Sequence, residues 1–334
     1  MRRHLLRFIS DTGDDKLSTV TLEKISISYG SQTVLSDASA TLAKDDRVAL
    51  CGPNGGGKST LLRVAAGELI PDAGSVRLQR GARICYLPQS GSSSDAAVSD
   101  HTVAEELELA FADQHLLSAQ VTDLEERMAN GEATDEVLTA YGNLTEDLER
   151  SGYHSRGKDI SAVMSGLGFK ESDRDRPLRE LSGGWEMRVA LGRVLLMQAD
   201  LLLLDEPTNY LDLSAREWLE DFLSRGEGGF IVVAHDRDFL DRCCRTVLEI
   251  RDGRLRSYTG GYTSFEQSRA DQISAEIKAY ELQQQEILRI EAFIRRFRAV
   301  ASKARLVQSR VRFLERMPRR HRPMQTSKIT VQLP

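Results

Sequence analysis

The segment Gly52-Pro-Asn-Gly-Gly-Gly-Lys-Ser-Thr60 constrains the fold of this 334-residue chain more than any other part of its sequence. It fits the pattern G-x-x-x-x-G-K-[ST], follows the apolar run Arg47–Cys51 and precedes a helical pattern at Leu61–Ala66. Glycines allow backbone N–H groups to turn inward around phosphate oxygens, and the following helix aims its positive N-terminus at them. A glycine-rich turn with only a structural role would not need Lys58 and Ser59 at these positions. The motif therefore predicts a phosphate-binding loop.

The loop supplies a group of candidate nucleotide contacts. Lys58 is expected to reach the outer phosphates, and the Ser59 hydroxyl is expected to ligate Mg²⁺. The candidate contacts are Gly52, Pro53, Asn54, Gly55, Gly56, Gly57, Lys58, Ser59 and Thr60.

An acidic pair, Asp205 and Glu206, follows the all-leucine run Leu201–Leu204. A run that is apolar on both faces is typical of a strand buried inside a parallel sheet. Nucleotide hydrolysis needs a carboxylate that holds Mg²⁺ and a second group that orients the attacking water. We therefore expect Asp205 to belong to the metal site and Glu206 to polarise the water.

Strand-like and helical patterns alternate along the chain. A mostly helical insert is predicted at about 100–170. Strands are predicted within 18–50 and 75–88 and at 201–204 and 230–234. This alternation predicts an α/β fold with a largely parallel sheet, as in the P-loop NTPases.

Three further signals complete a recognisable set. Leu181-Ser-Gly-Gly184 opens another predicted helix, and Gln89 and His235 each follow a predicted strand. The phosphate loop, Gln89, Leu-Ser-Gly-Gly, Asp205-Glu206 and His235, in this order, resemble an ATP-binding cassette across residues 18–262. The resemblance implies a cassette with a helical subdomain, and it implies ATP and Mg²⁺ as cofactors.

The resemblance also implies catalytic roles. Tyr29 would stack on adenine, Gln89 would sense Mg²⁺ and the attacking water, and His235 would hold the γ-phosphate and support Glu206. For His235, a buried and hydrogen-bonded histidine is the structural alternative. The implied metal site consists of Ser59, Gln89 and Asp205.

Other residues of the set are implied to act between two cassettes. Ser182, Gly183 and Gly184 would bind the γ-phosphate of ATP held by a different cassette, and Asp212 would lie at the contact between the two. Helix capping by Ser182 is the structural alternative. One cassette alone cannot complete such a site, so a second cassette is an expected partner.

Three features separate the chain from transporter cassettes, which are the alternative assignment. The signature continues with Trp185, where transporter cassettes usually have Gln. Residues 205–212 and 234–241 resemble the soluble F subfamily of ATP-binding-cassette proteins (ABC-F). That subfamily joins two cassettes by a long basic helical linker, which residues 263–322 resemble. The implied function is an ATPase that acts on the ribosome, and the alternative is the ATP-hydrolysing subunit of a transporter.

The net charge of −5 conceals two oppositely charged segments. Residues 101–150 carry 13 acidic and 2 basic side chains, whereas residues 289–322 carry 12 basic and 2 acidic ones. No glycine or proline interrupts residues 262–317, which predicts a hairpin of two long helices. Such a basic hairpin attracts phosphate backbone without base specificity. The candidate nucleic-acid contacts are Arg295, Arg296, Arg298, Lys303, Arg305, Arg310 and Arg312.

By resemblance to the F subfamily, the hairpin contacts tRNA and rRNA on the ribosome. The implied tasks are translation control, rescue of stalled ribosomes or protection against antibiotics. A solvated helix face or an acidic protein partner would also explain the basic residues. The acidic insert repels RNA, so a basic ribosomal protein is its expected neighbour.

The chain contains one phosphate loop and one Leu-Ser-Gly-Gly, where the F subfamily has two of each. The first half of a longer protein is the simplest expectation, and a natural half-molecule acting as a homodimer is the alternative. The expected organisation is an N-terminal extension at 1–17, a cassette at 18–262, a linker at 263–322 and the start of a second cassette at 323–334.

Composition narrows the remaining classes. No apolar run approaches the roughly 18 residues that a membrane-spanning helix needs. The four cysteines show neither a disulfide framework nor metal-ligand spacing. A cytoplasmic location is therefore expected.

Overall fold

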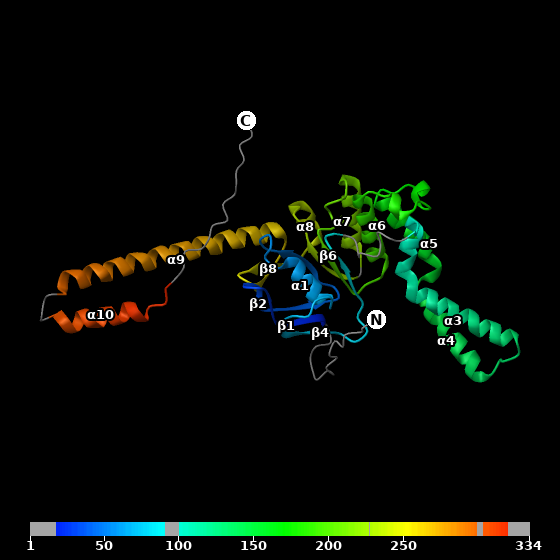
Figure 1. Ribbon diagram of the computed structural model, residues 1–334, viewed down its shortest axis with the longest axis horizontal. Helices are drawn as coiled ribbons and strands as arrows, with labels where there is room; N and C mark the ends of the chain where they lie inside the picture. Colours follow the sequence, from blue (N-terminus) through cyan, green and yellow to red (C-terminus); the bar gives the residue numbers. More distant parts are fainter. Residues whose placement is uncertain (1–17, 91–99, 227, 299–302, 320–334) are drawn as a thin grey trace, which may run out of the picture. The chain divides into compact units, whose positions relative to one another are not determined.

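The computed structural model describes residues 18–90, 100–226, 228–298 and 303–319 (Figure 1). The predicted N-terminal extension (1–17) and the predicted start of a second cassette (323–334) lie outside the described residues. The chain divides into two units, one ending at Tyr262 and the other beginning at Thr263. Within the described ranges, no helix is both long and apolar enough to cross a membrane.

Six strands form the central sheet of the first unit, in the order β5-β6-β7-β3-β8-β9. The first five are parallel, and β9 pairs antiparallel with β8. Every residue of β7 is buried, as a strand covered on both faces requires. The strands are β3 (Arg47–Cys51), β5 (Ile84–Leu87), β6 (Leu201–Asp205), β7 (Gly229–Val233), β8 (Thr246–Arg251) and β9 (Arg254–Thr259). The predicted parallel α/β core is confirmed.

A second, antiparallel sheet has the order β2-β1-β4. It belongs to the first unit as well, and its buried residues pack with Leu50 of β3 and with Leu62 in one hydrophobic core. A fully buried leucine contributes about 1.5–3 kcal/mol to stability, so this core holds the two sheets together. The strands are β1 (Ser18–Tyr29), β2 (Gln32–Ala43) and β4 (Ala73–Leu78).

The strand pattern predicted within 75–88 is confirmed. It contains β4 and β5, which belong to different sheets. The chain turns between them at Gly81, which has a φ of 83°, and the Ala82 N–H donates to Gln79 O at 3.1 Å. A positive φ at this position interrupts an extended run, and glycine adopts it without strain.

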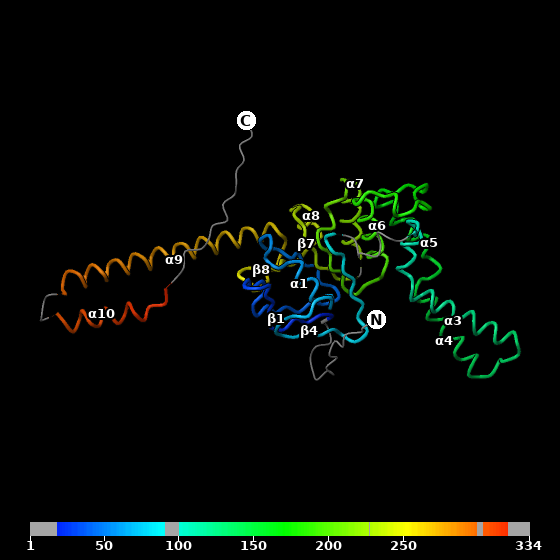
Figure 2. The backbone as a smooth tube through the Cα atoms, in the orientation of Figure 1, coloured from blue at the N-terminus to red at the C-terminus, as the bar shows by residue number. Residues whose placement is uncertain are grey.

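Four helices accompany the central sheet, and Figure 2 traces them along the backbone. The first begins at Lys58, three residues before the predicted start, because Gly57 takes a left-handed conformation at its N-cap. The helix predicted to open at Leu181-Ser-Gly-Gly184 begins at Gly183, and a 3₁₀ turn, η5 (Leu178–Glu180), precedes it. The four helices are α1 (Lys58–Ala65), α6 (Gly183–Leu196), α7 (Leu213–Arg225) and α8 (Arg237–Cys243).

The predicted helical insert is confirmed. Helices α3 and α4 pack side by side as an arm (Figure 1). The insert begins with a capping box, in which Thr102 accepts from the N–H of Glu105 and the Glu105 carboxylate accepts from the N–H of Thr102. Its elements are α2 (Val103–Glu108), η2 (Leu109–Phe111), α3 (Ala112–Ala129), α4 (Asp135–Arg150), η3 (Tyr153–Ser155) and α5 (Arg156–Gly166). The turn η4 (Glu171–Asp173) follows it.

The second unit is a helical hairpin, as predicted. It consists of α9 (Tyr262–Phe297) and α10 (Ala304–Arg316), which lie alongside each other in Figure 1. The Gln283 side-chain amide donates to Pro318 O at 2.8 Å, and this bond ties the end of α10 back to the middle of α9. The two helices are therefore antiparallel.

Candidate nucleotide site

Parallel strands bring the predicted site residues to one edge of the central sheet. Going along β5, β6, β7 and β3, the residues that end or follow each strand are Gln89, Asp205-Glu206, His235 and Gly52. Asp205 lies opposite Val233 in the register, two residues before His235. Ligands of open α/β sheets bind beyond the carboxyl ends of the strands. The strand order thus gathers residues that lie far apart in the sequence.

The phosphate loop is a tightly supported turn. Gly57 has a φ of 98°, and a Cβ placed on it would lie 2.6 Å from Cγ1 of Val34 on β2. Only glycine fits there without displacing that side chain. The Lys58 ammonium donates to the carbonyls of Gly52 and Pro53, each at 3.1 Å. The lysine therefore lies across the turn that its own loop makes.

The remaining loop residues differ in exposure. Pro53, Asn54 and Gly55 are exposed, whereas Gly56 is half-buried. Ser59 and Thr60 lie in the first turn of α1, where the backbone N–H groups have no partners within the helix. These donors and the exposed turn face the position that an anion would take.

Asp205 is a buried acid with only 1% of its surface exposed. Burial raises the pKa of its carboxyl, and Glu206 adds to this effect, while the Ser59 hydroxyl and Lys58 lower the pKa. Among the described residues, its Oδ2 atom has no hydrogen-bond partner. A buried oxygen without a partner costs about 1–3 kcal/mol.

This arrangement fits a magnesium ion. Mg²⁺ takes oxygen ligands and is usually bound by one or two protein groups together with substrate phosphates. Asp205 supplies an unpaired oxygen, and the Ser59 hydroxyl bonds to the same carboxylate. No cluster of three or more His, Cys, Asp or Glu side chains in the described ranges could hold a metal ion. Gln89 has no described contact with Asp205, and its predicted place in the metal site stays a prediction.

Glu206 is contacted by both predicted catalytic partners. The Gln89 amide donates to Glu206 Oε2 at 3.1 Å, and His235 Nε2 lies 3.3 Å from Oε1. The Asn209 amide also donates to Oε2. Sequence reasoning missed Asn209, although its place three residues after Glu206 is a local signal. The Glu206 side chain is 13% exposed, and three side chains contact its carboxylate.

The backbone of Glu206 is strained. Its φ is 56°, in the left-handed region that non-glycine residues rarely adopt. The Glu206 N–H donates to Val233 O at 2.8 Å, which extends the pairing of β6 with β7 by one residue. Such a conformation costs on the order of 1–3 kcal/mol and persists only where the surrounding structure enforces it.

The signature residues lie on a separate element. Ser182 occupies the N-cap position of α6, but its hydroxyl makes no capping bond, and Gly183 and Gly184 begin the helix. Within the part of the chain that the structure describes, no hydrogen bond or ion pair joins these three residues to the phosphate loop. The fold therefore does not bring this part of the predicted set into the cluster around Glu206.

Asp212 and Tyr29 occupy two further edges of the unit. Asp212 caps α7, because its Oδ1 accepts from the Ala215 N–H at 2.9 Å. This bond, together with the nearby Arg188 guanidinium, lowers the pKa of its carboxyl. Tyr29 ends β1 with 52% of its surface exposed, which leaves its ring available for stacking.

Sequence reasoning missed Arg188, which connects several elements. It is 9% exposed and donates to Tyr210 O at 2.9 Å and to Leu167 O at 2.8 Å. Its guanidinium also lies 3.4 Å from Oδ2 of Asp212 and 4.5 Å above the ring of Trp185. Arg188 thereby ties α6 to the segment before α7. The contacts with Tyr210, Leu167 and Asp212 span more than 20 residues, so no local signal pointed to them.

All seven candidate nucleic-acid contacts are exposed on the hairpin. In the described portion of the second unit, none of them forms an ion pair. Lys303 and Arg296 lie 3.7 and 5.3 Å from the ring of Phe297, which adds an aromatic surface to the basic one. The hairpin therefore presents cations that no acidic side chain neutralises within the described residues of this unit.

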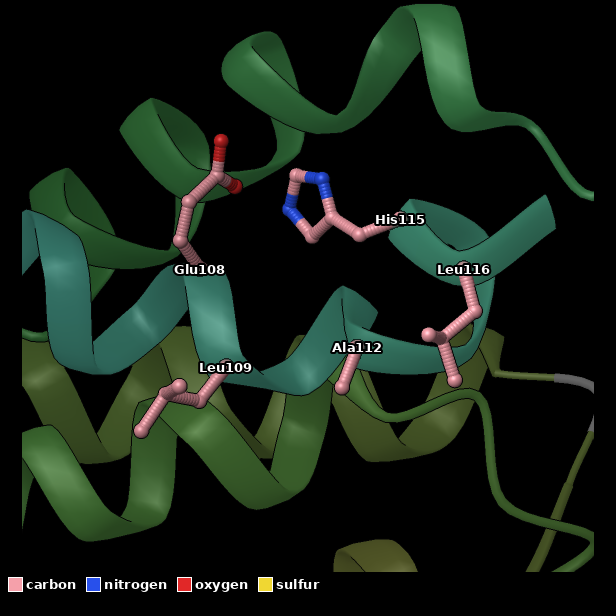
Figure 3. A pocket seen from close by; sticks show the side chains of 5 residues that line it. All are labelled: Glu108, Leu109, Ala112, His115 and Leu116. Carbon is pink, nitrogen blue, oxygen red and sulfur yellow. The ribbon is translucent and has the colours of Figure 1, made fainter. Parts of the chain in front are cut away.

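A pocket of about 430 Å³ lies at the root of the arm (Figure 3). The Arg156 guanidinium donates to Glu108 Oε1 at 3.2 Å, and His115 lies 3.1 Å from the Tyr153 hydroxyl. Among the described residues, Glu108 Oε2 is buried without a hydrogen-bond partner. The pocket contains none of the predicted nucleotide contacts. It is lined by Glu108, Leu109, Ala112, His115 and Leu116.

Comparison with known proteins gives the family. A family model described as "ABC transporter" matches residues 35–209, which is more than half of the chain, and a second model with that description matches 248–333. "Probable ATP-binding protein YheS" of Haemophilus influenzae is 36% identical over 298 residues, covering 89% of this chain and 45% of its own length. "ABC transporter F family member 2" of Arabidopsis thaliana is 34% identical, covering 99% of this chain and 50% of its own length.

"ATP-binding cassette sub-family F member 3" of Mus musculus is 34% identical, covering 93% of this chain and 42% of its own length. The chain thus spans about half the length of the curated relatives it matches.

Solved structures agree on the fold. The "ATP binding subunit of ABC transporter" gives a TM-score of 0.53 at 19% identity, covering 72% of this chain and 90% of that one. A dimeric post-hydrolysis state of the cassette MJ0796 with ADP and Pi gives 0.52 at 20%, covering 72% and 98%. The predicted cassette fold is confirmed. The chain belongs to the ATP-binding-cassette family of ATPases and, with its relatives, to the F subfamily.

Proposed function

We propose that this chain binds ATP with Mg²⁺ and hydrolyses it when a second cassette completes the site. The observation that carries this proposal is the convergence of Gln89 and His235 on the Glu206 carboxylate, at the sheet edge that also bears the phosphate loop. A structural ion pair would not need the phosphate loop two strands away.

The proposed reaction assigns one task to each group. Lys58 and the loop N–H groups bind the phosphates, while Asp205 and Ser59 hold the metal. The Mg²⁺ that these two residues would hold would neutralise negative charge on the phosphates. Glu206 accepts a proton from the water whose oxygen attacks the γ-phosphorus. The bond from phosphorus to the bridging oxygen breaks, and ADP leaves with the electron pair.

The partners of Glu206 have positioning and stabilising tasks in this scheme. His235 donates toward the γ-phosphate and limits the rotation of Glu206, and Gln89 fixes the other carboxylate oxygen. Tyr29 stacks on the adenine from the edge of the second sheet.

A second cassette is part of the proposal. Ser182, Gly183 and Gly184 begin α6 with backbone donors free of side-chain caps, a geometry suited to an anion. They would reach the γ-phosphate held by another cassette, with Asp212 at the contact. One solved structural neighbour is described as a dimer, which supports this pairing by fold analogy.

We also propose that the basic hairpin contacts tRNA and rRNA backbone when the protein acts on the ribosome in the cytoplasm. Seven exposed cations and the half-buried Phe297 ring suit phosphate contact and base stacking. The resemblance of residues 263–322 to the linker of the F subfamily supports the assignment more than the charge alone does. The task on the ribosome would be translation control, rescue or antibiotic protection.

Cosedimentation tests the ribosome contact, and ATP hydrolysis tests the site. The protein is centrifuged with ribosomes through sucrose, with and without ATP, at several salt concentrations. We expect ATP to increase the bound fraction and salt to lower it. Binding that is absent, or that does not respond to salt, contradicts the role of the hairpin.

Release of phosphate from ATP is measured separately with Mg²⁺ and with EDTA, and only the Mg²⁺ sample should show turnover.

A further inference from the structure

Helices α7 and α8 each begin at or next to a residue of the candidate nucleotide site. Asp212 is the N-cap of α7, and Asp236, next to His235, is the N-cap of α8. The two helices pack against each other. Two ion pairs join them, and the first involves the cap of α8 itself.

Arg216 forms that first ion pair. It lies one turn into α7, where its N–H donates to Asp212 O at 3.0 Å. Its guanidinium donates to Oδ2 of Asp236, and only 31% of the Arg216 side chain and 26% of the Asp236 side chain are exposed. The other oxygen of Asp236 accepts from the Phe239 N–H at 3.1 Å. Asp236 therefore holds its own helix with one oxygen and α7 with the other.

The second ion pair lies at the other end of α8. The Arg242 guanidinium donates to Glu220 Oε2 at 2.8 Å, and the Glu220 side chain is 10% exposed. Charged hydrogen bonds of this kind are about twice as strong as neutral ones. Helix α8 is therefore attached to α7 near both of its ends, which restricts its rotation and sliding against α7.

His235 depends on this attachment for its position. Its side chain is 65% exposed, so packing does little to hold the ring, yet Nε2 lies 3.3 Å from Glu206 Oε1. The residue that follows it, Asp236, is the one anchored to α7. The placement of the ring therefore follows from the placement of the backbone at Asp236.

We propose that Arg216 is a positioning residue for His235, acting through Asp236. This inference rests on the proposed function for its effect on turnover. Arg216 also lies one turn from Asp212, so the same contact fixes the start of α7 relative to His235. A displacement of Asp212 at the proposed cassette contact would therefore be transmitted through one turn of α7 to His235 and Glu206.

The test uses three variants of the ion pair. Arg216→Met keeps the apolar stem and removes the charge, and Arg216→Lys restores a cation. Asp236→Asn can still cap α8 through Oδ1, but it loses the charge that attracts Arg216. The matched control is Arg225→Met on the same helix, where Arg225 and its partner Asp221 are 80% and 67% exposed. Exposed pairs of that kind contribute little to stability.

We expect kcat for ATP to fall by between about tenfold and a hundredfold in Arg216→Met and Asp236→Asn, since small displacements of catalytic groups have effects of this size. KM for ATP should stay within about twofold of the original value, because the phosphate loop is untouched. Arg216→Lys should recover part of the loss, and Arg225→Met should lose nothing. An unchanged kcat in Arg216→Met overturns the proposal, as does an equal loss in Arg225→Met.

A second measurement does not need turnover. Histidine side chains are labelled for NMR, and the His235 signal is identified by its loss in His235→Gln. We expect one sharp imidazole signal in the original protein and in Arg225→Met, and exchange broadening in Arg216→Met. If the original protein hydrolyses no ATP even when a second cassette is supplied, the proposed function fails, and this signal alone decides the inference. A signal unaffected by Arg216→Met then overturns it.

Discussion

The side-chain amide of Gln89 donates a 3.1 Å hydrogen bond to Oε2 of Glu206 and so joins the ends of the neighbouring strands β5 and β6. On the other side, His235 at the end of β7 lies 3.3 Å from Oε1. The carboxylate is thus oriented by both flanking strands. A carboxylate held in this way needs no reorganisation when it accepts a proton.

Replacing Glu206 with Gln should separate binding from turnover. The amide keeps the shape of the side chain but cannot accept the proton of the attacking water, so we expect turnover to fall by about 10²–10⁴-fold. The Kd for a fluorescent ATP analogue should stay within about twofold, because Lys58 and the loop are unchanged. Phosphate release and fluorescence titration measure the two effects. The control is Glu217→Gln at an exposed position of α7, and undiminished hydrolysis in Glu206→Gln would contradict the assignment.

Replacing Lys58 with Ala should weaken nucleotide binding itself. The ammonium lies across the phosphate loop, and charged hydrogen bonds to phosphate contribute about 1.5–3 kcal/mol each. We expect the Kd for ATP to rise by at least about tenfold in a fluorescence titration. Lys44→Ala is the control, since Lys44 pairs with Asp200 at 2.8 Å and lies outside the loop. Equal Kd values for the two variants would refute the role of Lys58.

Replacing Asp205 with Asn should stabilise the nucleotide-free protein. Burial raises the pKa of this carboxyl in the folded state, so the folded chain binds the proton more tightly than the unfolded chain does. The free energy of unfolding therefore falls as pH rises above the ordinary carboxyl pKa, and it stays lowered at neutral pH. Asn carries no charge and avoids this loss.

We expect the Tm of Asp205→Asn at pH 7 to exceed that of the original protein by a few degrees, since about 1 kcal/mol corresponds to about 2–4 °C in a unit of this size. Thermal melts from pH 4 to pH 8 without nucleotide or metal measure the difference, which should shrink toward acid pH. Asp221→Asn on the surface of α7 should show no such trend. A gain that does not depend on pH would argue against buried charge as the cause.

Removing charge from α10 should change the salt dependence of RNA binding. The variant carries Arg305→Gln, Arg310→Gln and Arg312→Gln. Each phosphate contact contributes about 0.7–0.9 to the slope of log Kd against log salt, so three lost contacts lower the slope by about 2–3. The slope is measured from the fluorescence anisotropy of a labelled tRNA at salt concentrations between about 50 and about 300 mM.

The matched control carries three exposed arginines of the first unit changed to Gln, namely Arg77, Arg127 and Arg150. It has the same net charge as the α10 variant. We expect its slope to stay close to that of the original protein. Equal slopes for the two triple variants would mean that RNA responds to total charge and not to the hairpin.

The sequence predicted the parts of the fold that depend on local pattern. Gly52 to Ser59 implied a strand, a turn and a helix, and the apolar run at 201–204 implied a buried parallel strand; both are present. The region 75–88 was harder, since one turn at Gly81 sends two similar strands into different sheets. Period alone does not identify a strand's neighbours.

The site divides in the same way. Motif spacing identified Glu206, Gln89 and His235 as candidates, and the strand order explains why they lie together. Motif spacing did not identify Arg188 or the contact between Arg216 and Asp236, because these contacts join elements 20 or more residues apart in the sequence. Ordinary arginines on a helix surface have the same sequence signature. The functional roles of all these residues stay predictions until the variants are measured.

The left-handed backbone of Glu206 has an evolutionary consequence. A mutation to glycine there would relieve the torsional strain and make the free protein easier to fold. Selection for foldability alone would therefore drive this position away from glutamate. If glutamate persists at this position across generations, the chemical role of its carboxylate must outweigh the selection for a more stable backbone. The frequency of glycine at this position would then indicate how strongly a lineage depends on ATP turnover.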